Sequence, residues 1–462
     1  RPPARPQQPG PAVMRDAATL AAVRQALELD SAMEVQTDPV ELARLSRDAY
    51  DYSPVLTERL AACRAQLVVC PADVAAVERL AAVCAQHGVP LTVRGAGTGN
   101  YGQCVPLEGG VVMLSGGLRS IRELDPLTGV VTVEPGCPMR ELDQQLRRAG
   151  RQLRLLPSTW RSASIGGFIA GGSGGIGSIR WGFLRDPGHL LGLEAVSMEV
   201  RPRRFTLSGE QAEALNHAYG TNGIITALKL ATAPAVDWHQ LSLDCADWND
   251  AVALLQACCR SAVSLHLATL LERPVLQQLP DWSGPGGEHH RVLLLVSPDG
   301  ISSVTRLARS FDAAVHDLGP EELGGGRGLR ELSWNHTTLH MRASDPGWTY
   351  LQMLLPQPEA AAMDALRANW GENLLWHLEA VRQQGATRLA ALPLVRWQGA
   401  ERLNQLMEDC RGVGAVLFNP HVVTVEDGGL GVVDADQVAA KQRFDPAGLL
   451  NPGKLRGWQE RS

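Results

Sequence analysis

The sequence predicts an α+β protein built from two different structural units. Three observations favour this fold class. The chain has 462 residues, more than a typical single domain. Residues 66–232 alternate short apolar strands with helices and glycine-rich loops, whereas residues 236–418 run twice through the same order of strands and helices. We therefore expect a flexible N-terminal tail over 1–30, a first domain over 31–235, a second domain over 236–418 and a C-terminal segment over 419–462.

In the first domain, the clearest element is a helix over 73–88. Asp73 is typical of a helix start, the apolar residues recur at helical spacing, and Gly88 is typical of a helix end. A second helix is expected from Met139 to Ala149. Strands are expected at 90–93, 110–114, 130–133 and 192–200.

In the second domain, two rounds of the same element order indicate a ferredoxin-like pair that shares one antiparallel sheet. The first round has strands at 241–243, 263–270, 291–296 and 314–316, with helices at 248–260 and 301–312. The second round has strands at 349–355, 374–378, 389–395 and 414–418, with helices at 359–370 and 400–410.

Charge and composition exclude several classes of protein. The net charge is −6, with 43 basic and 49 acidic side chains, which gives no basic footprint for nucleic acid or anionic lipid. No apolar run approaches the roughly 18 residues of a membrane span. The nine cysteines fit neither a disulfide framework nor a zinc site. The Pro-rich residues 1–11 predict a disordered tail rather than a signal peptide, Met14 is a candidate natural start, and we expect a cytoplasmic protein.

Two glycine-rich segments indicate a bound cofactor. The first, residues 94–100, follows a predicted strand and allows successive backbone N–H groups to point at a pyrophosphate. No helix follows it directly, so a Rossmann motif is not indicated. The second, residues 166–182, contains eight glycines with Ile, Phe and Trp between them. Flexible linkers are usually polar, so the apolar residues between the glycines favour a loop that lines a ligand.

These segments resemble the FAD-linked oxidases of the vanillyl-alcohol oxidase and p-cresol methylhydroxylase superfamily, which includes glycolate oxidases and D-lactate dehydrogenases. The resemblance covers residues 66–232 and the C-terminal segment. It is carried, in order, by Cys70-Pro71-Ala72-Asp73-Val74, Arg94-Gly95-Ala96-Gly97-Thr98, Pro157-Ser158-Thr159, Ser164-Ile165-Gly166-Gly167, Gly174-Gly175-Ile176-Gly177, Tyr219-Gly220-Thr221-Asn222-Gly223-Ile224-Ile225-Thr226 and Phe444-Asp445-Pro446-Ala447-Gly448-Leu449-Leu450-Asn451-Pro452-Gly453-Lys454.

The resemblance implies an FAD-binding domain of two α+β subdomains, a cap domain over the flavin, and a set of cofactor-binding residues. That set is Arg94, Gly95, Ala96, Gly97, Thr98, Gly99, Ser158, Ser164, Gly166, Gly167, Gly171, Gly174, Gly177, Ile225 and Lys454. Covalent members carry a flavin-linking histidine where this chain has Thr98, and residues 138–244 contain no cysteine for a second link. We therefore expect FAD to be bound without a covalent bond.

Catalytic groups are expected from the cap, because oxidation of a hydroxy acid needs a base and a cation that fixes the carboxylate. His336 and Arg342 lie in one polar cluster, Arg396 ends a predicted strand, and His421 follows the last cap strand. His336 and His340 have i, i+4 spacing, but two histidines do not make a metal site. Metal-using D-2-hydroxy-acid dehydrogenases of this superfamily carry a late Glu-His-Gly motif, which this chain lacks, so no metal is expected.

The resulting hypothesis is an FAD-dependent oxidoreductase that oxidises a small hydroxy acid or related alcohol and passes electrons to oxygen, a quinone or a carrier protein. Three alternatives stay open: a sugar or aldonolactone oxidase on the same scaffold, a flavin-holding subunit of a larger complex without its own substrate, and a protein with no flavin.

Overall fold

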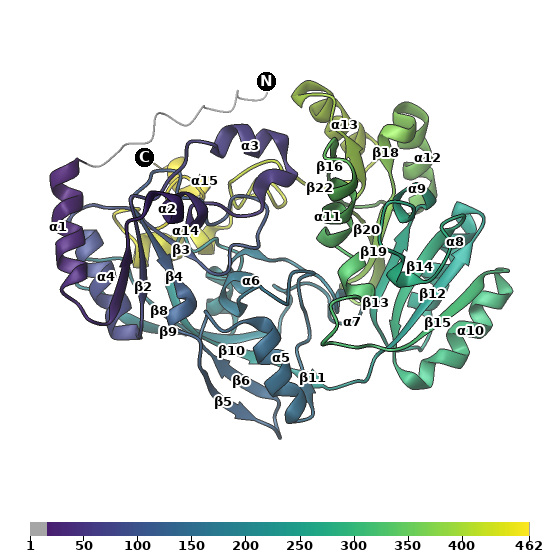
Figure 1. The fold of residues 1–462 in the computed structure, drawn as a ribbon, viewed down its shortest axis with the longest axis horizontal. Coiled ribbons are helices and arrows are strands. Elements are labelled where there is room, and N and C mark those ends of the chain that lie inside the picture. Colours follow the sequence, from purple (N-terminus) through teal and green to yellow (C-terminus); the bar gives the residue numbers. More distant parts are fainter. Residues whose placement is uncertain (1–15, 462) are drawn as a thin grey trace.

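The computed structural model describes residues 16–461. Two lobes lie side by side (Figure 1). The first lobe combines the N-terminal half of the chain with the C-terminal segment, and the second contains the residues between them. The predicted α+β class, with a cap attached to a two-subdomain base, is confirmed.

The first subdomain of the first lobe is built on a four-stranded sheet in the order β1-β2-β4-β3. Strands β2 and β3 run parallel to β4, and β1 is antiparallel to β2. Its strands are β1 (Met33–Gln36), β2 (Leu67–Pro71), β3 (Leu91–Arg94) and β4 (Val111–Leu114), and its helices are α2 (Pro39–Leu45), α3 (Pro54–Leu60) and α4 (Val74–Gln86). Asp73 caps α4 by accepting from the Ala76 backbone N–H at 2.7 Å, which confirms the helix predicted there.

The second subdomain has a five-stranded antiparallel sheet in the order β5-β6-β10-β8-β9. Its elements are β5 (Ile121–Asp125), β6 (Val130–Val133), α5 (Met139–Arg148), β7 (Arg151–Gln152), α6 (Ile165–Gly171), α7 (Ser178–Trp181), β8 (Leu190–Val196), β9 (Arg204–Ser208), β10 (Ile224–Ala231) and β11 (Ala233–Pro234). The second glycine-rich segment, expected to be a loop, begins as the helix α6, because Ser164 caps its first turn.

The expected N-terminal tail is partly wrong. Helix α1 (Ala17–Glu28) lies within it, and its side chains Val23 and Leu27 are fully buried in the core around the first sheet. The apolar residues of 17–28 recur at helical spacing, and this spacing is a better guide to the structure here than the polar composition of the preceding residues. The expected disorder of residues 1–11 falls outside the described residues.

The second lobe contains the predicted antiparallel sheet, with eight strands in the order β15-β12-β14-β13-β19-β20-β17-β22. Its strands are β12 (His239–Cys245), β13 (Leu265–Leu271), β14 (His290–Val296), β15 (Ala314–Pro320), β17 (Gln352–Leu354), β19 (His377–Gln383), β20 (Ala386–Ala391) and β22 (Val416–Phe418). Its helices are α8 (Trp248–Arg260), α9 (Arg273–Leu276), α10 (Ile301–Ser310), α11 (Asn335–Ser344), α12 (Glu359–Trp370) and α13 (Ala400–Gly412).

Three strands predicted in the second round are each divided in two. The divisions fall near Leu351, Trp376 and Pro393, where the chain leaves the large sheet. The separated pieces form a small sheet in the order β16-β21-β18, with β16 (Trp348–Tyr350), β18 (Leu374–Leu375) and β21 (Leu394–Arg396). These divisions could not be predicted from the sequence, because both pieces of each strand are buried and together form one continuous apolar run.

The C-terminal segment, with α14 (Ala435–Phe444) and α15 (Arg456–Gln459), returns to the first lobe. Leu91 and Asn451 anchor it there: the Leu91 N–H donates to the Leu449 carbonyl and the Asn451 N–H donates to the Leu91 carbonyl, both at 2.9 Å. This return places the Asn-Pro-Gly-Lys residues against the first glycine loop.

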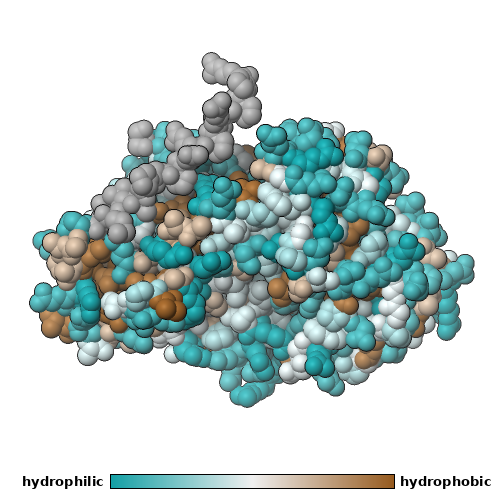
Figure 2. All heavy atoms as spheres, turned by 45° about the horizontal axis from the view of Figure 1, so that its top comes forward, coloured by the Kyte–Doolittle hydropathy of each residue, from teal (hydrophilic) through white to brown (hydrophobic). Residues whose placement is uncertain are grey.

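The surface in Figure 2 is largely hydrophilic, with small separate hydrophobic patches. Among the described helices, none has both the length and the apolar character needed to cross a membrane.

Candidate functional site

A cavity of about 990 Å³ lies between the two lobes. Its wall combines the first glycine loop, the second glycine-rich segment, residues 217–225, the cap strands β17, β20 and β22, and residues 425–437. This volume is at the upper end of the roughly 300–1,000 Å³ that is usual for small-molecule and cofactor sites.

The first glycine loop lies along this wall, with all of residues 95–99 exposed to the cavity. Gly97 has a φ of +69°, and a Cβ there would overlap the guanidinium of Arg94. Arg94 itself is not on the wall. Its buried guanidinium lies beneath the loop, with Nη1 3.3 Å from the Cys104 sulfur. Arg94 therefore supports the loop from below.

The second glycine-rich segment lies directly beside the first loop on the cavity wall, because a Cβ at Gly95 would overlap Ser164 Oγ. Ser164 Oγ accepts from the Gly167 N–H at 3.2 Å, which orders the first turn of α6. Of the residues predicted here, Ser158, Ser164, Gly166, Gly167, Gly171 and Gly174 are on the wall. Gly177 is not among the wall residues; it has a φ of +99° and begins α7. Its conformation shapes the segment without facing the cavity.

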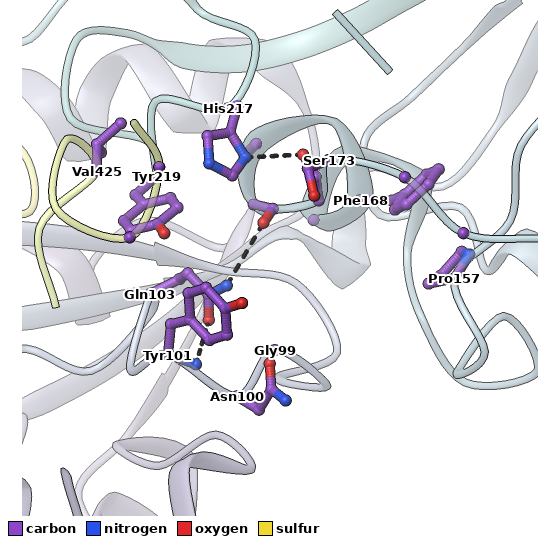
Figure 3. Close-up of a pocket in the computed structure, with 18 of the residues that line it drawn as sticks. Gly99, Asn100, Tyr101, Gln103, Pro157, Phe168, Ser173, His217, Tyr219 and Val425 are labelled. Atoms are coloured by element: carbon purple, nitrogen blue, oxygen red, sulfur yellow. Dashed lines mark hydrogen bonds between the residues drawn. The ribbon is translucent and has the colours of Figure 1, made fainter. Parts of the chain in front are cut away.

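A third segment, residues 217–225, completes this part of the wall (Figure 3). His217 and Tyr219 both have left-handed backbone conformations, with φ of 54° and 53°. His217 Nδ1 lies 2.7 Å from the Gly172 carbonyl. Because a carbonyl only accepts, Nδ1 carries the proton, and burial lowers the pKa of His217. The sequence analysis did not single out His217. Ile225, which it did, is on the wall.

Two charged side chains lie behind the first glycine loop. Lys454 is fully buried and donates to the Gly102 carbonyl, whereas Asp48 reaches the cavity wall. Burial raises the pKa of Asp48 to about 7, although Lys454 and Arg94 oppose the rise. Burial also lowers the pKa of Lys454 to about 8. Lys454, predicted to contact the cofactor, is not among the wall residues; it donates to the Gly102 and Gln103 carbonyls, which directly follow the first glycine loop.

These residues fit FAD. The two glycine-rich segments lie next to one another on the cavity wall and offer backbone without side chains, as a flat ring system and a pyrophosphate require. The Tyr219 hydroxyl lines the same cavity, is buried and has no partner among the described residues. Such an orphaned polar group is expected where a ligand supplies the missing hydrogen bond.

The cap side of the wall is mostly apolar, with a few polar groups. Tyr101 from the first lobe donates its hydroxyl to Gln352 at 2.5 Å, and Gln352 in turn donates to Asn335 at 3.4 Å. Arg388, on β20, donates to the Gln383 side chain and to the Leu355 carbonyl, each at 3.0 Å. Within the described residues, Arg388 has no carboxylate partner, and its buried Nε has no hydrogen-bond partner. It is a free cation at the wall.

The four residues predicted to be catalytic lie elsewhere, and none is part of the cavity wall. Arg342 donates to the Trp348 and Pro346 carbonyls, and Arg396 pairs with Asp345 at 2.5 Å. His421 is buried between Ser53 and the Tyr350 carbonyl. The structure therefore brings most of the predicted cofactor residues together, with Arg94, Gly177 and Lys454 off the wall, but not the predicted catalytic ones.

His336, the fourth, is half-buried and lies close to His340, with ring centroids 6.4 Å apart. Burial lowers the pKa of His336 to about 4, and His340 Nε2 is held by the Glu331 carbonyl at 2.8 Å. Across residues 16–461, no group of three or more His, Cys, Asp or Glu side chains has a metal-binding arrangement.

Comparison with known proteins agrees with the geometry. The FAD binding domain family matches residues 65–199. The chain is 28% identical to the glycolate oxidase subunit GlcD of Bacillus subtilis over 243 residues, which cover 50% of this chain and 51% of that protein. It is 26% identical to the D-lactate dehydrogenase of Archaeoglobus fulgidus over 446 residues, or 88% of this chain and 95% of that protein.

Among solved structures, an alkyldihydroxyacetonephosphate synthase aligns with a TM-score of 0.73 and 14% identity, over 95% of this chain and 85% of that one. At this identity the likeness concerns the fold alone. The match to the Bacillus protein spans about half of that protein's length. Taken with the cavity and its glycine-rich wall, these matches show that residues 65–199 form an FAD binding domain and that FAD is the cofactor.

Proposed function

We propose that the protein is an FAD-dependent oxidoreductase that oxidises the hydroxyl group of a small hydroxy acid. The observation that carries this proposal is Arg388, an unpaired cation on the cap side of the same cavity that the two glycine-rich segments line. The names of the two relatives, a glycolate oxidase subunit and a D-lactate dehydrogenase, both point to hydroxy acids.

Arg388 is suited to hold the carboxylate of such a substrate. Its guanidinium is fixed by Gln383 and by the Leu355 carbonyl, which leaves further N–H groups of the two terminal nitrogens for an anion. A charge-assisted hydrogen bond of this kind contributes about 1.5–3 kcal/mol. Bound FAD supplies the two-electron acceptor, and the protein contributes orientation and a cavity shielded from bulk water.

The flavin spectrum tests the proposal directly. Purified protein should show oxidised-flavin absorbance that is retained through gel filtration and released from the protein by acid precipitation, as expected for non-covalent FAD. Anaerobic addition of one member of a panel of 2-hydroxy acids should then bleach it. Bleaching by neutral sugars alone would select the sugar or aldonolactone oxidase and leave Arg388 without its anion.

A second candidate, a flavin-holding subunit of a larger complex, is favoured by one specific observation. The cap-side wall, as described, contains no histidine or carboxylate that could accept the proton of the substrate hydroxyl. Tyr101 is nearby, but burial raises its pKa well above the usual value, so its hydroxyl stays protonated and cannot accept the substrate proton. Protein whose flavin is bleached by dithionite and by no substrate, until a partner subunit is added, would select this candidate.

A further inference from the structure

Trp334, on the cavity wall, has a backbone conformation that is unusual for a residue with a side chain. It lies just before α11, with φ of 51° and ψ of −135°. Glycine adopts this region freely, whereas a residue with a bulky side chain is strained there. Its half-buried side chain nevertheless lines the cavity, so the strain is retained at a place where a side chain faces the ligand space.

A buried carboxylate holds Trp334 in this conformation. The Trp334 backbone N–H donates to Glu379 Oε1 at 2.7 Å. Glu379 is 1% exposed and is itself held on both sides. The Thr269 hydroxyl donates to Oε2 at 2.7 Å, and His377 Nε2 lies 2.7 Å from Oε1. Thr269 and Glu379 are cross-strand neighbours on β13 and β19.

The other side of the Trp334 corner reaches the first lobe. Asn335, the next residue, accepts from Gln352, and Gln352 accepts from the Tyr101 hydroxyl. Tyr101 follows the first glycine loop. A continuous set of hydrogen bonds and one peptide link therefore runs from the buried carboxylate in the cap to the cofactor side of the cavity.

We infer that Glu379 is a positioning residue, which fixes Trp334 and Asn335 as the cap-side wall of the substrate space. The inference rests on the proposed function only for the identity of the ligand; the hydrogen bonds that fix Trp334 and Asn335 do not depend on it. A corner with a purely structural role is best served by glycine, which adopts this φ without strain. The use of tryptophan, with a buried charged acceptor for its N–H, indicates that the position of the indole ring is what is maintained.

Fluorine NMR of the FAD-loaded protein tests this. The chain has 11 tryptophans, so labelling with 5-fluorotryptophan should give 11 signals, and the signal lost in Trp334→Phe identifies residue 334. In Glu379→Ala we expect the Trp334 signal to move and to broaden or split. In Glu379→Gln, whose amide oxygen can still accept the Trp334 N–H, the signal should return close to the wild-type position.

Asp244→Asn is the matched control. Asp244 is a carboxylate in the same sheet that holds Arg291 at 2.5 Å and His316 at 2.9 Å, away from the cavity. This variant should lower the melting temperature while leaving the Trp334 signal in place. A Trp334 signal that is unchanged in Glu379→Ala, or one that moves equally in Asp244→Asn, would overturn the inference.

A second measurement does not depend on any change at Glu379. Because glycine is the residue least strained at φ 51° and ψ −135°, Trp334→Gly should melt roughly 1–3 °C above Trp334→Ala. An equal or reversed order would show that the corner is not strained.

Substrate kinetics separate this inference from the proposed function. If a hydroxy acid bleaches the flavin, Glu379→Ala should lower kcat/KM by roughly 10- to 100-fold through misplacement of the wall, with rescue in Glu379→Gln. If no substrate bleaches it, the proposed function fails while the NMR result still decides the role of Glu379.

Discussion

His421 Nε2 lies 2.8 Å from the carbonyl oxygen of Tyr350. A carbonyl can only accept, so Nε2 carries the proton, and Nδ1 accepts from the Ser53 hydroxyl at 2.7 Å. Ser53 Oγ also accepts from the Leu56 N–H at the start of α3. The imidazole therefore joins the cap to the first lobe as a neutral ring with both nitrogens occupied. His421 therefore links the two lobes, and neither ring nitrogen is free to accept a proton from a substrate.

The first prediction is that His421 makes folding sensitive to acid. Burial lowers the pKa of His421 from 6.5 to about 4. The unfolded chain thus binds a proton between these values while the folded chain does not, so the contribution of His421 to stability is complete above pH 6.5 and declines as the pH falls towards 4. In His421→Gln, the loss of unfolding free energy between pH 6.5 and pH 5 should be smaller by about 2 kcal/mol.

Urea unfolding at both pH values measures this difference. The pH dependence of flavin reduction serves as the companion measurement, because it should keep its shape in His421→Gln. A lost limb in that profile would restore His421 as the catalytic base.

The second prediction concerns Arg388. Arg388→Gln removes the unpaired cation from the wall, so KM for a hydroxy acid should rise roughly 10- to 100-fold, with a smaller rise in Arg388→Lys. Arg396→Ala is the control: Arg396 stacks on Trp348 at 3.9 Å and pairs with Asp345, off the wall. Steady-state and anaerobic flavin reduction would measure both. Equal effects of the two variants would show that Arg388 has no special role.

The third prediction tests the second glycine-rich segment. A Cβ at Gly175 would overlap the Leu156 carbonyl oxygen, whereas a Cβ at Gly412 meets nothing within 4 Å. Gly175→Ala must therefore shift the backbone at the wall and should weaken FAD binding at least tenfold, which corresponds to about 1.4 kcal/mol. Gly412→Ala should bind FAD normally. Titration of apo-protein with FAD, followed by flavin fluorescence, compares the two.

The fourth prediction is a pH dependence of FAD affinity set by Asp48 and Lys454. These groups titrate as a coupled pair, with pKa values of about 7 and about 8. As the pH rises from 6 to 9, the pair changes from net positive to net negative beneath the first glycine loop. Because the cofactor is an anion, its dissociation constant should increase roughly tenfold or more across this range.

The double variant Asp48→Asn/Lys454→Met carries no charge at either position, so its FAD affinity should be nearly constant from pH 6 to 9. The same dissociation constants, measured at four pH values, test it. A double variant with the wild-type slope would assign the pH dependence to other groups.

Most of the cofactor residues could be predicted from the sequence because each lies in a short motif that is recognisable without knowledge of distant contacts. Gly95, Gly97 and Gly166 lie in short segments whose spacing alone requires close backbone approach, and the structure puts all three on one wall. Helices α8 and α12 were predicted with the bounds that the structure has, Trp248–Arg260 and Glu359–Trp370, because their apolar spacing and flanking residues are also local.

The cap-side residues of the cavity wall could not be predicted from local motifs. Arg388 is one polar residue in an ordinary strand, and its position at the wall depends on the pairing of β20 with β17 and β19. The occupied nitrogens of His421 depend on Ser53, 368 residues earlier in the chain. Such pairings of distant residues leave no pattern in a single sequence, so histidines and arginines near the expected site were chosen by residue type alone.

The return of the C-terminal segment has a consequence for biosynthesis. The Asn451 side chain holds the Gln103 carbonyl at 2.8 Å across 348 residues of sequence, and Lys454 holds the neighbouring Gly102 carbonyl. A ribosome that has finished the first glycine loop must therefore add more than 340 further residues before that loop has its permanent support. We therefore expect stable cofactor binding only after residues 451–454 have been synthesised, and a nascent chain arrested before residue 451 should bind FAD weakly.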